Sequence, residues 1–343
     1  MMDIDTPEAP AASRVAVIGA GSWGSAIAWL LGSKGTAVTL WSRDQALVDY
    51  FNSEQQNPRY LSDIVFPANV QASADLQQSL SSAAAAVLVT PSMALAEMAE
   101  RLRDLVSPEL PLIILSKGLD PSSLSYLDET LARAVGHPER IAVLSGPNHA
   151  EEVCKAIPAA TVVASKNATC AQFFQELLAT PTFRVYNSED TIGVQLCGAT
   201  KNVIAIACGL ASGLGLGDNT QAMLMTRGLA EIARLVKAAG GQSITCMGLA
   251  GMGDLIATCT STHSRNRSFG LELANGGSLK SYQDRTHMVV EGALAAQTVS
   301  ALAAKYQVEL PICEQVRSIV WEDQPIDQAF HSLINREFKP EFY

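Results

Sequence analysis

The first half of the chain alternates short apolar runs with longer segments of helical pattern, for example over 92–105 and 122–135. The apolar runs are continuous, which is typical of strands in a parallel sheet that is buried on both faces. This order of strand, helix and strand predicts a doubly wound α/β fold. The predicted strands are RVAVIG (14–19), AVTLW (37–41), AAVLVT (85–90), PLIILS (111–116), RIAVLS (140–145) and ATVVAS (160–165).

From about residue 188 the pattern becomes helical. We therefore predict an α/β domain over 14–188 and an all-helical domain over 189–343. The start, 1–13, is acidic and rich in Pro and Ala, and we predict that it is a disordered tail. It has neither the cationic nor the apolar part of a signal peptide, so it is not predicted to be one. In the second domain the pattern predicts helices over 191–208, 220–239, 290–305 and 311–321, with glycine-rich loops over 209–219 and 248–254.

A glycine motif follows the first predicted strand. Gly19, Gly21 and Gly24 form G-x-G-x-x-G, directly after an apolar run and directly before a helical pattern. This context is the one that dinucleotide binding requires. Gly19 permits the tight turn, Gly21 lets the backbone approach a pyrophosphate, and Gly24 allows strand and helix to pack closely. Free amides at the helix start favour the anion. The alternative is a glycine-rich turn without a ligand.

The second predicted strand ends in LWSRD, which places Arg43 before Asp44. An acidic residue here usually holds the ribose 2′-hydroxyl of NADH, whereas an arginine accommodates the 2′-phosphate of NADPH. Arg43 favours NADPH over NADH. Asp44 is alternatively a turn residue or the N-cap of the next helix.

Three further apolar runs end in small or polar residues, in VLVTPS, IILSKG and VLSGPNHA. Ligands of open α/β sheets lie outside the carboxyl ends of the strands. Thr90, Lys117, Gly146 and Asn148 are therefore expected at one edge of the sheet. A solvated lysine and an ordinary Gly-Pro turn are the alternatives for Lys117 and Gly146.

The apolar segment LCGATKNVIAIA (196–207) predicts a buried helix with Lys201 in its middle. A buried ammonium without a partner is costly. Either the side chain reaches solvent along one helix face, or it serves as a general acid and base. Asn202 follows it, as an orienting group or a satisfied core amide.

The segment GMGDLIATCTSTHSRNRSFG contains Asp254, Ser264, Arg265 and Asn266. Asp254 is predicted to be an N-cap, a partner of Lys201 or a contact to a substrate hydroxyl. Ser264, Arg265 and Asn266 suit a phosphate at a helix start, or form a polar loop. Glu291 stands at the start of another predicted helix, where capping is its alternative role.

Composition narrows the class of protein. The 343 residues are 48% hydrophobic and 17% charged, enough for two domains with a substantial core. The net charge of −10 argues against a nucleic-acid surface. Seven scattered cysteines without a C-x-x-C pair predict reduced thiols, a cytoplasmic location and no metal site. No uncharged apolar run reaches the ~18 residues of a membrane span, so stable membrane insertion is not expected.

These motifs together resemble those of bacterial NAD(P)-dependent sn-glycerol-3-phosphate dehydrogenases. The resemblance extends over essentially the whole chain after the tail. It implies a Rossmann-type domain followed by an all-helical substrate domain, and reversible reduction of dihydroxyacetone phosphate to sn-glycerol 3-phosphate for glycerophospholipid synthesis. It also implies a homodimer. The matching segments are VIGAGSWGSAIA, LWSRD, NPRYLSDIVFP, VLVTPS, LSKGL, LSGPNHAEEV, QLCGATKNVIAIACG, TRGLAEIARL, GMGDLIATC, SRNRSFG and VVEG.

The resemblance also implies roles for individual residues, with Lys201 as the residue that transfers the proton. In the related motif S-G-P-S-F-A a serine and a phenylalanine stand where this chain has Asn148 and His149. The implied substrate contacts are Lys117, Gly146, Asn148, Asp254, Ser264, Arg265 and Asn266. The implied cofactor contacts, beside Gly19, Gly21 and Gly24, are Ser22, Trp23, Arg43, Lys117, Ala150, Arg265, Val289 and Glu291.

Two other classes of protein fit parts of the pattern. Dehydrogenases and reductases of hydroxy acids, such as the 6-phosphogluconate and ketopantoate enzymes, also combine a dinucleotide domain with a lysine on a helical domain. A dinucleotide-binding sensor without turnover is the other class. The segments SRN and SGPNHAEEV favour a triose phosphate.

Overall fold

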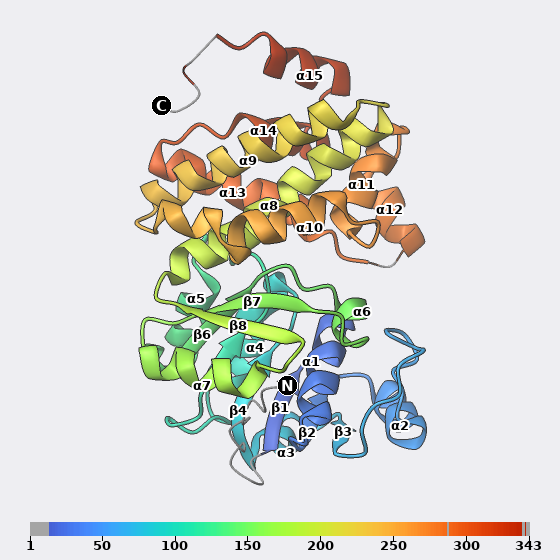
Figure 1. Cartoon of the computed structure of the whole chain (residues 1–343), viewed down its shortest axis with the longest axis vertical. Coiled ribbons are helices and arrows are strands. Elements are labelled where there is room, and N and C mark those ends of the chain that lie inside the picture. The colour runs from blue at the N-terminus through green and yellow to red at the C-terminus, as the bar shows by residue number, and fades with distance from the viewer. Residues whose placement is uncertain (1–13, 287, 338–339, 341–343) are drawn as a thin grey trace, which may run out of the picture. The chain divides into compact units, whose positions relative to one another are not determined.

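The computed structural model describes residues 14–286, 288–337 and 340, and the predicted tail 1–13 lies outside them. The described residues form two compact units. The first unit holds residues 14–120 and 125–191, and the second holds 121–124 and the residues from 192 onward. Figure 1 labels the helices and strands of each unit.

The first unit is built on one eight-stranded sheet in the order β3-β2-β1-β4-β5-β6-β7-β8. All six predicted strands are confirmed, each within two residues of its expected ends. The chain runs outward from β1 to β3 and then crosses to β4, which is the order of a doubly wound sheet. The confirmed strands are β1 (Arg14–Ile18), β2 (Val38–Trp41), β4 (Ala83–Leu88), β5 (Leu112–Ile114), β6 (Ile141–Ser145) and β7 (Ala159–Ala164).

The two edge strands were missing from the prediction. In β3 (Val70–Ser73) and β8 (Phe183–Ser188), buried and exposed positions alternate over the first residues. An edge strand has one partner and one wet face, so it carries polar residues such as Gln71 and Arg184. A search for continuous apolar runs therefore passes over both edges of the sheet.

The parallel pairing expected from the apolar runs was wrong at one pair of strands. β6 and β7 pair antiparallel, whereas the other neighbouring strands are parallel. A parallel return needs a crossover connection, usually with a helix along the sheet. The connection over 146–158 contains only the four-residue helix α6 (Ala150–Val153).

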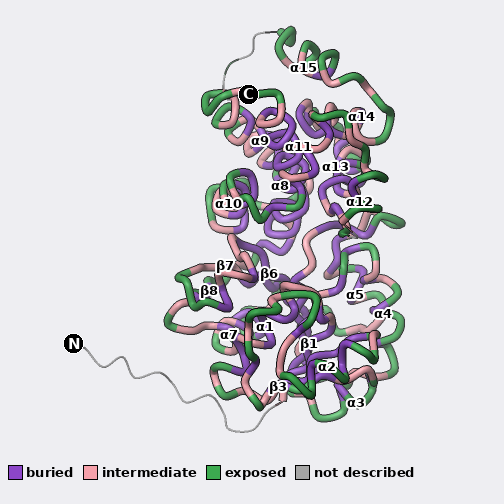
Figure 2. Tube along the Cα trace, turned by 90° about the vertical axis from the view of Figure 1, so that its right-hand side faces the viewer, coloured by how far each residue is buried: buried purple, intermediate pink, exposed green. Residues whose placement is uncertain are grey.

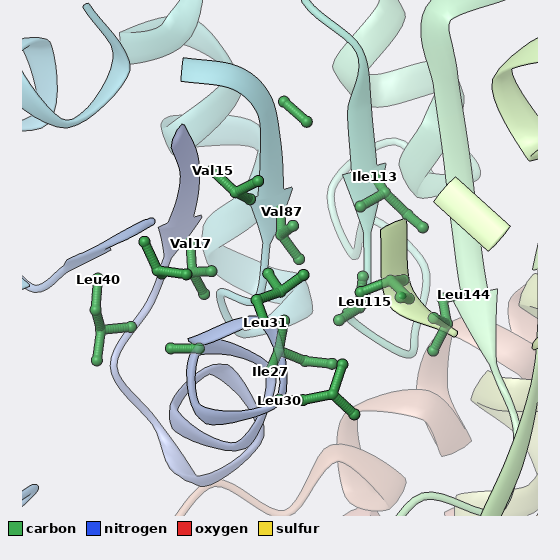
Figure 3. Close-up of a cluster of buried hydrophobic side chains, with 14 of the residues drawn as sticks. Val15, Val17, Ile27, Leu30, Leu31, Leu40, Val87, Ile113, Leu115 and Leu144 are labelled. Carbon is green, nitrogen blue, oxygen red and sulfur yellow. The ribbon is translucent and has the colours of Figure 1, made fainter. Parts of the chain in front are cut away.

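Helices cover the sheet of the first unit, and α1 packs against its centre. Figure 3 shows Ile27, Leu30 and Leu31 of this helix among valines and leucines of the strands. The predicted helices over 92–105 and 122–135 are confirmed in shorter form, as α4 and α5. The helices are α1 (Ser22–Ser33), α2 (Gln45–Glu54), α3 (Leu76–Leu80), α4 (Leu95–Leu102), α5 (Leu127–Val135), α6 and α7 (Ala168–Leu178), with short 3-10 turns η1 (Ser92–Ala94) and η2 (Pro138–Arg140).

The described part of the second unit is helical, and α8 (Thr191–Gly213) is its buried core (Figure 2). This helix is long and apolar enough to cross a membrane, but 94% of its most apolar window is buried within the protein, as in the core helix of a folded domain. The other elements are α9 (Asp218–Ala238), η3 (Ser243–Met247), η4 (Leu249–Gly253), α10 (Asp254–Thr260), α11 (Arg265–Ala274), α12 (Leu279–Thr286), α13 (Glu291–Tyr306), α14 (Pro311–Trp321) and α15 (Ile326–Ile334).

Both glycine-rich segments expected to be loops are partly helical. Helix α8 continues through Gly209 to Gly213, and a π-helical turn, η4, occupies Leu249–Gly253. A Cβ on Gly209 would lie 2.1 Å from the backbone oxygen of Arg267, and one on Gly270 would lie 2.2 Å from that of Ile206. These glycines therefore serve close contact between α8 and α11 rather than a change of chain direction.

Glu231 of α9 is a buried carboxylate with a structural role. It is 2% exposed. Its two oxygens accept hydrogen bonds from the backbone N–H groups of Ile312 (2.7 Å) and Cys313 (3.2 Å), in the first turn of α14. A carboxylate at a helix N-terminus satisfies amides that have no partner within the helix. Glu231 thereby fastens α14 to α9.

The stability of the second unit is expected to depend on Glu231 between pH 4.5 and 7. Burial raises the pKa of this carboxyl from 4.5 to about 7, so in this range the folded protein holds a proton that the unfolded chain has released. The contribution of Glu231 to the free energy of unfolding therefore falls as pH rises, by about 3 kcal/mol in total. Urea denaturation of the protein and of Glu231→Gln at both pH values measures this, because glutamine does not titrate. A stability difference between the two proteins that is the same at both pH values would contradict it.

Candidate active site

The glycine motif adopts the tight turn that its spacing predicts. Gly19 has a φ of +121°, and a Cβ there would lie 2.8 Å from the backbone oxygen of Val89, at the end of β4. A Cβ on Gly24 would lie 1.8 Å from the oxygen of Gly19. The loop is therefore packed against the β1–β4 pair and against the first turn of α1. Only residues without a side chain fit at these two positions.

Gly21 differs from its two neighbours in the motif, because a Cβ there would meet no protein atom within 4 Å. Gly21 is the N-cap of α1, it forms no side-chain cap, and the first turn of the helix has no acidic residue. An uncapped helix start beside open space provides amides and a positive dipole end for an anion. The residues present therefore fit the pyrophosphate of a dinucleotide.

Three of the other predicted cofactor contacts of the first unit lie around this helix start. Ser22 donates a hydrogen bond to Glu151 of α6 (3.4 Å). The Trp23 ring lies 6.4 Å from that of Phe183 and is partly buried. Ala150 is buried at the beginning of α6.

At the end of β2, Arg43 is exposed and Asp44 is engaged by the protein. Asp44 is the N-cap of α2 and accepts a hydrogen bond from the backbone N–H of Leu47 (3.3 Å), which confirms the capping alternative. Its other oxygen pairs with Arg59 at 2.5 Å. The hydrogen bond from Leu47 lowers the pKa of Asp44, and Arg59 lowers it further. The carboxylate therefore stays ionised and neutralised by the protein itself.

The ends of β5 and β6 bring together Lys117, Gly146 and Asn148. The Lys117 ammonium donates a hydrogen bond to the backbone oxygen of Gly146 (3.0 Å), so it is held at the sheet edge rather than freely solvated. Gly146 is buried, and a Cβ there would lie 2.8 Å from the Cα of Thr161 in β7. Asn148 donates to the backbone oxygen of Ala160 (3.2 Å), while its own side-chain oxygen is buried without a partner among the described residues.

In the second unit Lys201 is buried, 5% exposed, with a carboxylate beside it. Its ammonium donates hydrogen bonds to Asp254 of α10, which is 2% exposed, and to the hydroxyl of Thr258 (2.7 Å). The Thr258 hydroxyl in turn donates to the backbone oxygen of Asp254 (2.6 Å). Of the three sequence alternatives for Asp254, the structure confirms the pairing with Lys201. The N-cap alternative was wrong, because Gly253 takes that position.

The thiol next to this cluster is not a competing reactive group. A hydrogen bond with Cys208 raises the pKa of Cys259 well above its usual range, and burial adds to the effect. A thiol, unlike a thiolate, is a poor nucleophile. No group of three His, Cys, Asp or Glu residues that could hold a metal ion is present in the described part of the chain. Proton exchange at the Lys201–Asp254 pair is thus the chemistry that this cluster offers.

The predicted phosphate segment is the start of α11. Ser264 is its N-cap and accepts a hydrogen bond from the backbone N–H of Arg267 (3.2 Å), while Arg265 is exposed in the first helical position. The Asn266 side chain is already used within the protein: it donates to the Asn202 side chain (2.9 Å) and accepts from the backbone N–H of Gly292 (2.9 Å). These two amides fasten α8, α11 and α13 together.

The last two predicted contacts are at the start of α13. Glu291 is its first residue, in a first turn without a side-chain cap, and Val289 is partly buried just before the N-cap Val290. Sequence reasoning assigned no role to Arg59 or Thr258. Thr258 had a usable signal, because residues four apart in a helix lie on one face, as Asp254 and Thr258 do. Arg59 had none, since it lies far along the chain from Asp44.

A doubly wound sheet whose first strand ends in this glycine loop is the architecture of a dinucleotide-dependent oxidoreductase. Comparisons with known proteins specify the family. Residues 14–171 match the family model for the N-terminus of NAD-dependent glycerol-3-phosphate dehydrogenase, and residues 190–331 match the model for its C-terminus. The chain therefore belongs to the NAD-dependent glycerol-3-phosphate dehydrogenase family.

Individual relatives agree over nearly the full length. The chain is 44% identical to glycerol-3-phosphate dehydrogenase [NAD(P)+] of Nocardia farcinica, over 96% of this chain and 100% of the relative. It is 42% identical to glycerol-3-phosphate dehydrogenase [NAD(P)+] 2 of Mycobacterium tuberculosis, over 96% and 99%. The crystal structure of glycerol-3-phosphate dehydrogenase from Coxiella burnetii superposes with a TM-score of 0.90 at 41% identity, covering 94% of this chain and 99% of that one.

Proposed function

We propose that this protein catalyses the reversible reduction of dihydroxyacetone phosphate to sn-glycerol 3-phosphate with NADPH or NADH. The observation that carries the proposal is the buried Lys201–Asp254 pair in a family of dehydrogenases. A proton donor is what ketone reduction demands of the protein, because negative charge develops on the carbonyl oxygen as the carbon is reduced.

In this proposal the first unit binds the nucleotide. Gly19, Gly21 and Gly24 form the loop for the pyrophosphate, which the amides of Ser22 and Trp23 stabilise at the start of α1. The bound nicotinamide supplies the hydride. The further proposed cofactor contacts are Arg43, Lys117, Ala150, Arg265, Val289 and Glu291.

Lys201 donates the proton to the substrate oxygen in reduction and accepts it in oxidation. Asp254 and Thr258 hold its side chain through hydrogen bonds, so the Nζ atom is positioned before substrate arrives. Burial excludes water from the pair, which strengthens the interaction of the ammonium with the developing alkoxide. Asn202 supports this arrangement indirectly, through its hydrogen bond with Asn266.

The start of α11 is the proposed phosphate site. Arg265 supplies a guanidinium, and the first backbone amides of the helix, including that of Asn266, supply donors. The Ser264 hydroxyl uses only an acceptor lone pair in capping, and the Asn266 amide uses one N–H for Asn202, so each side chain keeps a donor that we propose for the phosphate. Lys117, Gly146, Asn148 and Asp254 are the other proposed substrate contacts.

We infer a preference for NADPH from the charges at the end of β2. Asp44 pairs with Arg59 and is bonded to α2, so the exposed Arg43, which forms no ion pair with the described residues, contributes a positive charge there. Arg43→Ala is expected to raise the KM for NADPH about tenfold and to leave the KM for NADH within about twofold, because only NADPH loses a charge-assisted hydrogen bond. Initial rates with both cofactors measure this. Arg103→Ala, which removes an exposed arginine of the same unit, is the control. Equal effects of Arg43→Ala on both cofactors would contradict the inference.

The reaction itself is tested by following the absorbance of reduced nicotinamide with the purified protein and dihydroxyacetone phosphate. Parallel assays with ketopantoate and other 2-keto acids test the hydroxy-acid enzymes as the alternative. The expected result is that NADPH is oxidised with dihydroxyacetone phosphate and not with the keto acids. Turnover only with a keto acid, or cofactor binding without any turnover, would overturn the substrate assignment.

The wider roles follow from the same proposal. We propose residues 14–188 as the nucleotide domain and 189–343 as the substrate domain, in a cytoplasmic enzyme that supplies sn-glycerol 3-phosphate for glycerophospholipid synthesis.

We also propose a homodimer. Exposed apolar side chains of the second unit, among them Ile244 and Met247 of η3, support an association surface there. A mass near that of one 36.4 kDa chain in light scattering would contradict the dimer.

A further inference from the structure

Asn57, the first residue of the segment NPRYLSDIVFP, lies between the two parts of the proposed nucleotide site, and the proposed reaction gives it no role. It is 0% exposed. Its side-chain nitrogen donates to the backbone oxygen of Ala20 (3.0 Å) and to the hydroxyl of Ser25 (2.9 Å). Its side-chain oxygen accepts from the backbone N–H groups of Arg59 (3.0 Å) and Tyr60 (3.1 Å). An amide has two donors and two acceptor lone pairs, and here all four are used.

The side-chain nitrogen of Asn57 is the donor half of this amide, and the side-chain oxygen is its acceptor half. The donor half bonds to the glycine loop. Ala20 stands between Gly19 and Gly21, and its carbonyl belongs to the same planar trans peptide as the N–H of Gly21. In such a peptide the C=O and N–H bonds point in opposite directions. By holding the Ala20 oxygen toward the interior, Asn57 turns the Gly21 N–H away from itself. Gly21 is the residue at which the loop is open to a ligand.

The acceptor half controls the turn that carries Arg59. Hydrogen bonds from two successive amides to one asparagine oxygen stabilise a tight turn. From this turn Arg59 reaches Asp44, which follows β2 and caps α2. One buried side chain therefore links the loop proposed for the pyrophosphate to the charges proposed for the ribose phosphate.

We propose that Asn57 is a positioning residue for the nucleotide: its donors orient the Gly19–Gly24 loop toward the pyrophosphate, and its acceptors hold Arg59 against Asp44 to set the preference for NADPH. This rests on the proposed function in two respects: the protein must bind a nicotinamide dinucleotide, and it must prefer NADPH. Asn57 acts through the loop and the turn and does not itself contact the cofactor.

Asn57→Asp separates the two halves, since it keeps the acceptor oxygens and removes both donors. The Kd for NADPH and that for NADH are each expected to rise about tenfold or more, with their ratio unchanged within about twofold. Asn57→Ala removes both halves, so it should weaken binding and also reduce the preference for NADPH. Titration calorimetry without substrate measures both affinities. In turnover assays of Asn57→Asp the KM for NADPH should rise, with kcat at saturating cofactor within about threefold.

Asn69 provides a matched control at the other end of α1. Its side-chain nitrogen also donates to two backbone oxygens, those of Gly32 (2.9 Å) and Thr36 (2.8 Å). Asn69→Asp should lower the Tm but leave cofactor Kd within twofold. An Asn57→Asp protein with unchanged Kd, or an equal rise of Kd in Asn69→Asp, would overturn the positioning role. If Asn57→Asp does not fold, Asn57→Ala carries the test, because it buries no charge. Absence of dinucleotide binding by the unsubstituted protein would instead contradict the proposed function.

Discussion

Replacing Lys201 with methionine is expected to lower kcat for dihydroxyacetone phosphate reduction by about 10²- to 10⁴-fold, the usual contribution of a general acid. Methionine has a similar length but no proton to donate. The Kd for NADPH should remain within about twofold, because the proposed nucleotide loop belongs to the first unit and Lys201 to the second. Stopped-flow or steady-state absorbance of NADPH measures the turnover.

The same substitution is expected to lower the free energy of unfolding by about 3 kcal/mol or more, because it leaves the Asp254 carboxylate buried without its counterion. The double variant Lys201→Met/Asp254→Asn removes both charges, so most of that stability should return. Its turnover should stay as low as that of the single variant. Recovery of turnover in the double variant would show that the single variant lost activity through misfolding, and near-normal turnover of Lys201→Met would sink the assignment outright.

Alanine substitutions at Gly21 and Gly24 are expected to have opposite consequences, although the residues are three apart in one loop. In Gly24→Ala the new Cβ would lie 1.8 Å from the Gly19 oxygen, and both atoms belong to the backbone of a tight turn. The first unit should lose about 3 kcal/mol or more of stability. In Gly21→Ala the Cβ meets no protein atom within 4 Å. That variant should lose less than about 1 kcal/mol, the difference between glycine and alanine at an N-cap.

Although Gly21→Ala should hardly change stability, it should strongly weaken cofactor binding. A methyl group on Gly21 occupies the space through which a pyrophosphate approaches the backbone, so Gly21→Ala should raise the Kd for NADPH by about 10- to 100-fold. Thermal denaturation and calorimetric titration of the two variants separate these effects. If Gly21→Ala bound NADPH as tightly as the unsubstituted protein, the pyrophosphate would have to bind elsewhere on the first unit.

The sequence predictions were accurate for features that depend on neighbouring residues and failed for features that depend on distant ones. Continuous apolar runs predicted all six strands that have a neighbour on both sides in the sheet. The edge strands β3 and β8 were missed because one face of each is polar. The direction of β7 was also missed, since the apolar pattern of a strand is the same whichever way it runs.

The candidate site shows the same division. The spacing of Gly19, Gly21 and Gly24 is contained in six residues, so the turn could be predicted from it alone. The partner of Lys201 could not, since Asp254 lies 53 positions away and had three plausible roles. The segment proposed to bind phosphate was correctly predicted to begin a helix, but the sequence could not show that the Asn266 side chain is bonded to Asn202 and Gly292.

By itself, the sequence determined the two-part organisation, the central strands, the glycine turn and a single ammonium within an apolar helix, because periodicity and turn chemistry act over a few neighbouring residues. Only the tertiary structure decided that Asp254 and Thr258 surround that ammonium, that Arg59 neutralises Asp44, and that Asn57 joins the loop to the turn. These are contacts between residues far apart in the chain, and packing, rather than local pattern, selects them.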